Sequence, residues 1–136
     1  MDDRELARRT LKEGFSLVAV NDSRILLKTR LPGMKGLLQA IQDLGEKLKG
    51  SSVADTIVGR AAALLLVYSE VVYVFAVTIS QSGSETLEEN GVQYDFETQV
   101  PVILDRNKGG PCPFEELTKE ISNPKEAFEK LASSHG

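Results

Sequence analysis

A lone cysteine, Cys112, stands where several features of a binding site coincide in the chain. It follows an extended segment, 93–104, and directly precedes Pro113, a residue that favours the first position of a helix. A thiolate at such a helix start faces free backbone N–H groups and the positive end of the helix dipole, which makes it a candidate nucleophile. A small buried residue at a helix start explains the same cysteine equally well, so both interpretations stay open.

The loop around this cysteine carries polar and glycine residues that suit a ligand. Asn107 and Lys108 precede the pair Gly109-Gly110, and Glu115 is the third residue of the predicted helix. Ligands of α/β proteins commonly bind where a strand ends and a helix begins, so we assign these five residues to a candidate ligand-binding site. A glycine pair is also a common plain turn, and the functional and structural interpretations of this loop are evenly balanced.

A second set of candidates lies in an apolar stretch, 55–67, which predicts a central buried helix. Asp55 lies at or near its start, where Asp is a good N-cap and where Ser52 completes a capping box. Gly59 inside a helix costs about 0.5–1 kcal/mol relative to Ala, which suggests a close backbone approach there. Arg60, the only charged residue after Asp55 in this stretch, offers its guanidinium to a phosphate or carboxylate, or to a neighbouring acid.

Alternating helix and strand patterns predict the framework that must position these side chains. We predict helices between residues 2 and 14, capped by Asp2 or Asp3, and over 34–48, 55–67, 82–89, 113–121 and 124–131, the last capped by Asn123. Strands are predicted over 15–20, 24–28, 71–79 and 93–104. Asn21-Asp22-Ser23 tolerates positive φ between the first two strands and predicts a β-hairpin. Strands alternating with helices predict an α/β fold, a three-layer α/β/α sandwich with a mixed sheet of four or five strands.

Composition excludes several classes of protein. A chain of 136 residues with 41% hydrophobic residues predicts one domain over 1–136. Sixteen Lys and Arg against twenty Asp and Glu give a net charge of −4, which argues against a general nucleic-acid binder. One Cys excludes an internal disulfide and a multi-cysteine zinc cage, and one His, at position 135, excludes the usual histidine-based sites. We therefore expect no metal and no cofactor.

The distribution of apolar residues bears on localisation. No apolar stretch follows the first five residues, so a signal peptide is not expected. The longest apolar region, 61–77, is interrupted by Ser69-Glu70 and is too short on either side to cross a bilayer. A lone thiol suits a reducing compartment. We expect a cytoplasmic protein that binds neither membrane nor nucleic acid.

Two motifs, taken together, resemble a known family. They are Asp55-Thr-Ile-Val-Gly-Arg-Ala-Ala-Ala, followed by a strand, and Cys112-Pro-Phe-Glu, which opens a later helix. Over nearly its whole length the chain resembles a small bacterial and archaeal family of unassigned function within the cytidine-deaminase-like fold. The resemblance implies a mixed sheet between helices, beginning with the predicted hairpin.

The resemblance also implies what the chain lacks. In active zinc deaminases one helix carries His-x-Glu and a second carries Pro-Cys-x-x-Cys. Pro111-Cys112 matches the start of the second motif, and Glu115 stands at the position of its second cysteine. Val58 occupies the histidine position and Arg60 that of the proton-shuttling glutamate. A catalytic zinc site needs three protein ligands, and an arginine cannot shuttle protons at neutral pH, so zinc-dependent deamination is not expected.

The leading functional hypothesis is a metal-free pocket around Cys112, Asp55 and Arg60 for a nucleotide-like or other anionic small molecule. Arg60 and the helix starts would hold the anion, while Asp55 would accept a hydrogen bond or act as the base beside Cys112. One alternative is a cysteine-dependent enzyme or redox sensor of unknown substrate. Another is a non-catalytic structural or partner-binding module. Homodimerisation stays open because nothing in the sequence specifies an interface.

Overall fold

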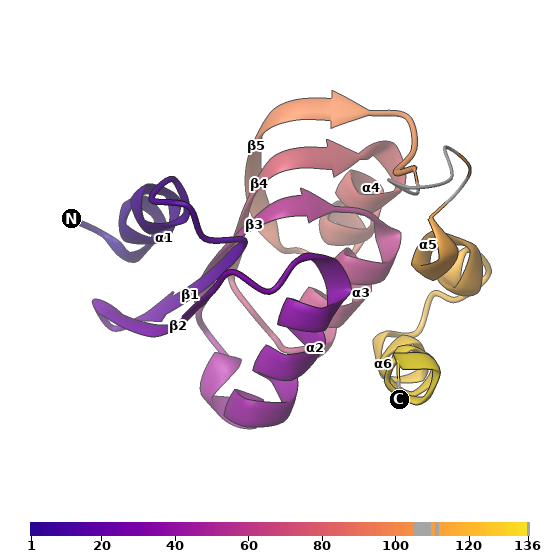
Figure 1. Cartoon of the computed structure of the whole chain (residues 1–136), viewed down its shortest axis with the longest axis horizontal. Helices are drawn as coiled ribbons and strands as arrows, with labels where there is room; N and C mark the ends of the chain where they lie inside the picture. Colours follow the sequence, from indigo (N-terminus) through magenta and orange to yellow (C-terminus); the bar gives the residue numbers. More distant parts are fainter. Residues whose placement is uncertain (105–109, 111, 136) are drawn as a thin grey trace.

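The structure, a computed structural model, describes residues 1–104, 110 and 112–135. Helices and strands alternate through most of the described chain (Figure 1). In chain order they are α1 (Asp3–Leu11), β1 (Leu17–Asn21), β2 (Arg24–Thr29), α2 (Gly33–Leu44), the 3-10 helix η1 (Gly45–Leu48), β3 (Ser52–Val58), α3 (Arg60–Tyr68), β4 (Tyr73–Ser80), α4 (Gln81–Glu89), β5 (Gln93–Val100), α5 (Pro113–Thr118) and α6 (Pro124–His135).

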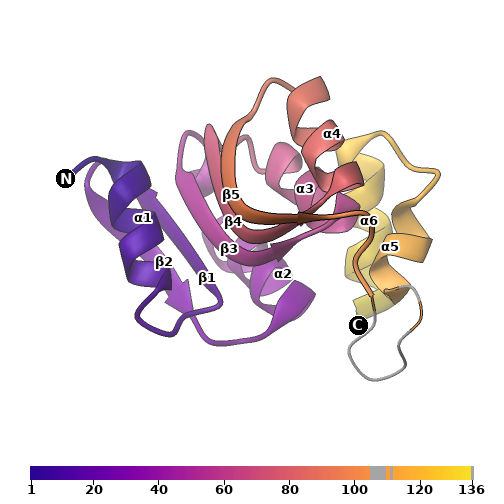
Figure 2. The same ribbon diagram turned by 90° about the horizontal axis from the view of Figure 1, so that it is seen from above.

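The strands form one mixed sheet with the order β2-β1-β3-β4-β5. β1 runs antiparallel to both β2 and β3, whereas β3, β4 and β5 run parallel to one another. Figure 2 shows α1 on one face of this sheet and the other helices on the opposite face. The predicted α/β/α sandwich with a mixed sheet is thereby confirmed, with five strands.

The β1–β2 hairpin turns at the residues that the sequence indicated. Asp22 and Ser23 have φ of 51° and 64°, which places both central residues of the turn in the left-handed region. Such a two-residue turn matches the right-handed twist of the strands that it joins. The hairpin prediction is therefore confirmed, and its turn has the positive φ angles on which the prediction was based.

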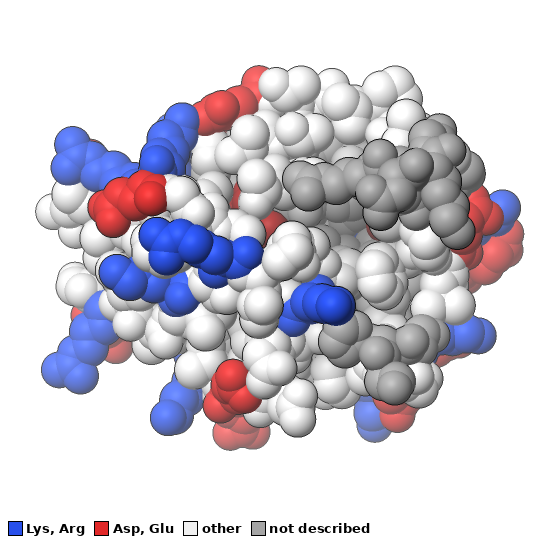
Figure 3. All heavy atoms as spheres, viewed as in Figure 1, with Lys and Arg blue, Asp and Glu red and all other residues white. Residues whose placement is uncertain are grey.

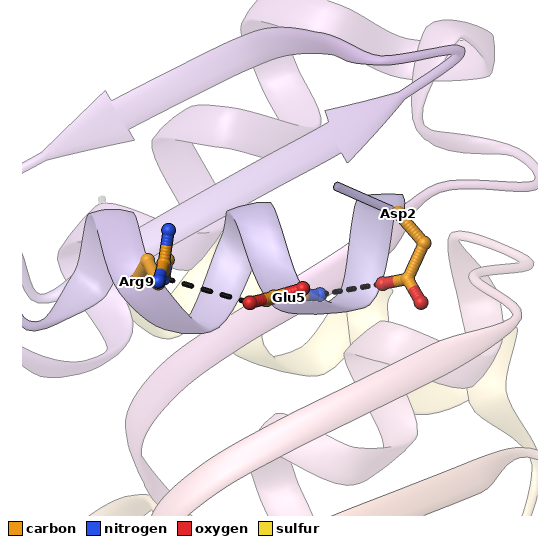
Figure 4. A network of polar contacts seen from close by, with 3 residues as sticks. All are labelled: Asp2, Glu5 and Arg9. Atoms are coloured by element: carbon orange, nitrogen blue, oxygen red, sulfur yellow. Dashed lines mark hydrogen bonds and ion pairs between the residues drawn. The ribbon is translucent and has the colours of Figure 1, made fainter.

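Helix α1 begins with the predicted aspartate cap. The side chain of Asp2 accepts a hydrogen bond of 2.8 Å from the backbone N–H of Glu5, and the carboxylate of Glu5 lies 3.6 Å from Nε of Arg9 one turn later (Figure 4). The cap satisfies one of the N–H groups left free at a helix start. The Glu5–Arg9 pair is exposed and adds little stability.

Helix α1 covers its face of the sheet by itself among the described helices. Ala7 and Leu11 pack against a cluster that includes the buried rings of Tyr73 and Phe75. The guanidinium of Arg8 lies 4.9 Å from the centre of the Phe75 ring. The hydroxyl of Tyr73 donates a hydrogen bond of 2.7 Å to Asp95, and burial, reinforced by that carboxylate, raises the pKa of Tyr73 to about 12.

The opposite face carries the larger core. Helices α2, α3, α4 and α6 all contribute buried apolar side chains to one cluster with β1, β3 and β4. Helix α6 is part of this core, because Ala127 and Leu131 are fully buried and Phe128 stacks on Tyr68 with ring centres 4.6 Å apart. None of the helices within residues 1–104 and 112–135 is long and apolar enough to cross a membrane.

One predicted element is wrong in its first part: residues 55–58 belong to strand β3, and helix α3 begins only at Arg60. β3 is covered on both faces, with Val53 in one core cluster and Ala54 in the other. A strand buried on both sides shows a nearly continuous apolar run, which periodicity cannot distinguish from a buried helix. Gly59 separates the strand from the helix as the N-cap of α3.

Several other boundaries differ by a few residues from the predicted ones. The helix predicted over 34–48 is α2, which ends at Leu44; its C-cap Gly45, with φ of 51°, begins η1. β5 ends at Val100, before Pro101, since proline cannot donate to a sheet ladder. Helix α6 has the predicted cap, because the side chain of Asn123 accepts from the N–H of Glu126 at 3.0 Å.

A buried hydroxyl gives the first testable prediction. Ser51 is fully buried, and within the described part of the chain its side-chain oxygen has no hydrogen-bond partner. We expect Ser51→Ala to raise the free energy of unfolding by roughly 1 kcal/mol in urea titrations, because alanine removes an unsatisfied polar atom. Ser69→Ala is the matched control, since the Ser69 hydroxyl is also buried but donates to the carbonyl of Leu65 at 2.9 Å. Equal destabilisation in both variants would contradict this account.

Candidate functional site

The start of helix α3 is bound by a carboxylate from helix α5. The two oxygens of Glu115 accept hydrogen bonds of 2.7 Å from the backbone N–H of Arg60 and 2.8 Å from that of Ala61. The N-cap of α3, Gly59, has no side chain to do this. Glu115 therefore satisfies two N–H groups that a helix start leaves free, and its negative charge lies at the positive end of the helix dipole.

The contact between Glu115 and α3 requires a residue without a side chain at position 59. A Cβ placed on Gly59 would lie 2.3 Å from Oε1 of Glu115, closer than atoms can approach. Its backbone also lies against Gly83 at the start of α4, where a Cβ would lie 2.7 Å from the carbonyl oxygen of Val58. The close approach that the sequence suggested at Gly59 is thus found at the helix cap, and its partner is a side chain of the same protein.

Arg60 is held by hydrogen bonds within the protein. Its Nε donates to the carbonyl of Thr118 at 3.0 Å, one terminal nitrogen donates to the hydroxyl of Thr86 at 3.4 Å, and the other donates to the carbonyl of Ile121. These acceptors lie at the end of α5, just after it, and on α4. The partners are neutral oxygen atoms, whereas the sequence pointed to a phosphate, a carboxylate or a neighbouring acid.

Cys112 is the N-cap of α5, as its position before Pro113 predicted. It is half-buried, and its N–H donates to the carbonyl of Ile103 at 3.3 Å. Helix α5 spans six residues, about 9 Å along its axis, with Cys112 at one end and the acceptors of the Arg60 guanidinium at the other. The structure therefore does not bring the guanidinium to the sulfur, and the expected cluster of Cys112, Asp55 and Arg60 loses this member.

Asp55 lies in strand β3, so the expectation that it caps a helix is wrong. By the alternation of strand residues its side chain shares the face of Val53, which packs in the larger core, and it is flanked by Leu17 and Ala76 of the same core. Asp55 is only 8% exposed. This burial raises the pKa of Asp55 to about 7, although hydrogen bonds from the backbone of Thr56 and Ile57 act in the opposite direction.

The remaining predicted site residues are only partly placed. Gly110 is half-buried, whereas Asn107, Lys108 and Gly109 lie outside the described residues. Sequence reasoning missed Thr86 and Thr118 as partners of Arg60. No sequence signal marks Thr118, because it accepts through its backbone carbonyl, whereas Thr86 is a buried polar residue whose position only the fold reveals.

Two hollows in the described surface lie away from these residues. One, of about 540 Å³, is lined by Val72, Gln93 and neighbours, and the other, of about 460 Å³, by Asp22, Ser52 and neighbours. Both open where the parallel strands begin, whereas ligands of α/β sheets bind where such strands end. Within the described residues no group of three His, Cys, Asp or Glu side chains is arranged to hold a metal ion.

Comparison with known protein families identifies one family that covers most of the chain. Residues 6–134 match the family model described as TM1506, a domain of unknown function (DUF1893). The chain belongs to this family. A search of curated proteins gives no match.

Solved structures that are similar to the chain include the following two. One is a DUF1893 family protein, TM1506 of Thermotoga maritima, with a TM-score of 0.86 and 27% sequence identity over 98% of this chain and 92% of the other. The second is RibD of Acinetobacter baumannii, with a TM-score of 0.50 and 19% identity over 69% of this chain. The chain matches about a third of the length of RibD (34%), and this likeness concerns the fold alone.

A double-mutant cycle tests the bond between α5 and α3. We expect Glu115→Ala to lower the free energy of unfolding by about 1–3 kcal/mol, because two N–H groups lose their acceptor. Gly59→Ala should destabilise the wild-type protein through its clash with the carboxylate and should cost less once Glu115 is alanine. The coupling energy from urea titrations should therefore exceed about 1 kcal/mol. Glu116→Ala is the control, since its exposed pair with Lys119 contributes little. Additive effects of the two site substitutions would exclude the contact.

The burial of Asp55 predicts a pH-dependent stability. Folding raises its pKa from 3.8 to about 7, so between these values the folded chain binds more protons than the unfolded chain. The free energy of unfolding therefore falls as pH rises through this window, by roughly 2–3 kcal/mol from about pH 5 to about pH 8.

Asp55→Asn removes the titrating group and should flatten this part of the profile. Urea titrations across the pH range, repeated on the exposed-position control Asp43→Asn, measure the difference. A wild-type decline that persists undiminished in Asp55→Asn would assign the effect to another group.

Proposed function

We propose that this protein is a metal-independent, deaminase-like domain that binds a small molecule where its parallel strands end, with Asp55 and Cys112 as the residues that contact it. The observation that carries the proposal is the burial of the Asp55 carboxyl on a central strand. A carboxyl among core residues such as Leu17 and Ala76 destabilises the fold when it ionises, and groups of this kind cluster at functional sites.

The chemistry of Asp55 suits recognition of nitrogen groups. With a pKa of about 7, its carboxyl donates a hydrogen bond when protonated and accepts one when ionised. Either form pairs with the edge of a heterocycle, such as the base of a nucleotide-like molecule, or with an amine. In an environment of low dielectric constant such a bond is stronger than in water, so one well-placed carboxyl contributes much of the selectivity.

The deaminase-like part of the proposal is supported by the fold shared with RibD and by the two aligned motifs. At the position that corresponds to the metal-binding histidine, Val58 is fully buried and apolar. At the position of the general acid, the guanidinium of Arg60 binds backbone carbonyls. Neither side chain suits zinc chemistry, so we propose binding without zinc-dependent deamination.

The roles of Gly59, Arg60 and Glu115 in this proposal differ from the sequence-based expectation. We propose that they fix the walls of the site, because each is engaged with another part of the protein. Gly110 stays a candidate for direct ligand contact. So do Asn107, Lys108 and Gly109, which lie outside the described residues.

Ligand-induced thermal stabilisation tests the proposal. We expect a member of a panel of bases, nucleosides, nucleotides and amines to raise the melting temperature of the wild type, with about 2.7 kcal/mol of stabilisation at a concentration one hundred times its dissociation constant. The effect should be lost in Asp55→Asn and kept in the control Asp43→Asn. Equal stabilisation of all three proteins would show that the ligand binds elsewhere, and a panel without any hit would refute binding of these classes.

A second candidate function is a non-catalytic structural or partner-binding module. The observation that favours it is the internal satisfaction of the polar groups of Arg60 and Glu115, which leaves these two side chains bound within the fold. It predicts that Asp55→Asn retains all cellular function and that no panel member stabilises the wild type. No contact in the described structure favours the cysteine-dependent alternative, which stays a prediction.

A further inference from the structure

The carboxylate of Glu115 occupies the place where an anionic group would bind. A helix start attracts anions through its free N–H groups and its dipole, and the first two N–H groups of α3 are already bonded to this carboxylate. The carboxylate also lies directly against the backbone of Gly59, which leaves no space for a second group there. An added phosphate or carboxylate would have to displace Glu115, or lie beside a like charge.

The other described groups near this position also disfavour an anion. Arg60 is the cation that α3 itself carries. Its guanidinium already donates hydrogen bonds to carbonyls at the far end of α5 and to the hydroxyl of Thr86. Helix α5 and the turn after it carry Glu115, Glu116 and Glu120 against one cation, Lys119. Figure 3 shows that Lys and Arg side chains gather on the opposite half of the visible face, over α1 and the hairpin.

We infer that Glu115 is a specificity-determining residue that excludes anionic ligands from the start of α3, just after β3 ends, so that a small molecule recognised at Asp55, four residues before Gly59, presents a neutral or cationic nitrogen donor. The inference rests on the proposed function for the position of the ligand. It reverses the expectation of an anion, because the two features that suggested one, Arg60 and the helix start, are engaged within the protein. Amides, amidines and amines are the matching ligand classes.

The selectivity follows from charge and from space. The Glu115 carboxylate neutralises the partial positive charge at the start of α3, so an incoming anion gains no favourable field there. A nitrogen donor approaching Asp55 needs neither the α3 N–H groups nor Arg60. Shortening the side chain of residue 115 removes the charge and opens the space beside Gly59, and both changes favour a small anion.

Titration of backbone amides with sodium acetate tests the inference directly. In ¹H–¹⁵N spectra of the wild type, we expect the resonances of Arg60 and Ala61 to stay unchanged as acetate is added. In Glu115→Ala they should move in a saturable way, with acetate binding at least about tenfold tighter than to the wild type and with recovery of part of the lost melting temperature. Glu116→Ala is the matched control and should behave as the wild type.

The same spectra recorded with acetamidinium and with inorganic phosphate complete the experiment. Wild-type shifts of the Arg60 and Ala61 amides on addition of acetate or phosphate would overturn anion exclusion, and this arm decides the matter even if Glu115→Ala does not fold. Shifts around Asp55 with acetamidinium and none with phosphate support it. If acetate binds the alanine variant but no nitrogen donor perturbs Asp55, anion exclusion stands and the proposed function fails. If a phosphorylated ligand binds the wild type at the α3 amides, the exclusion fails and small-molecule binding stands.

Discussion

The hydrogen bonds between the Glu115 carboxylate and the first N–H groups of α3 set the arrangement of this end of the molecule. They connect a short helix that follows the sheet to a helix at the centre of the core. Arg60 completes the connection in the other direction, because its backbone N–H binds the first turn of α5 while its side chain binds the carbonyl groups at the end of the same helix. A helix of six residues has little stability of its own, so these polar contacts, with Phe114 and Leu117 against the core, hold it in place.

This connection differs from the arrangement that the resemblance to zinc deaminases implied. In a zinc deaminase the two aligned helix starts are joined through a metal ion. Here a carboxylate from one helix bonds directly to the backbone of the other, and the position aligned with the general acid holds a guanidinium that is bonded to carbonyls. Among the described residues Asp55 is the one carboxyl that lies buried in the core, and it lies on strand β3 rather than at a helix start.

The fold followed from local patterns wherever these had a single interpretation. The hairpin turn, the aspartate cap of α1, the asparagine cap of α6 and Cys112 as the N-cap of α5 were each indicated by residue types with strict backbone or capping preferences. β3 was not, because a strand buried on both faces has no alternation to reveal it. The contacts of the candidate site residues could not be predicted in the same way. Glu115 and Arg60 were marked by type and position, yet most of their partners are backbone groups that lie 54 to 61 residues away in the chain and carry no sequence signal.

The packing of α1 has a consequence for how the chain acquires its structure during synthesis. Its apolar side packs on Val18 and Val20 of β1 and on Ala54 of β3, and also on Tyr73 and Phe75 of β4, which leave the ribosome only after α2, β3 and α3 have been made. The first helix therefore meets β1 soon after it is made, but its packing surface is complete only when the fourth strand appears, and the far helix α6 completes the opposite face last. Such distant pairing slows folding, and it makes the emerging half-chain, with one side of its hairpin uncovered, the state in which chaperones would be needed most.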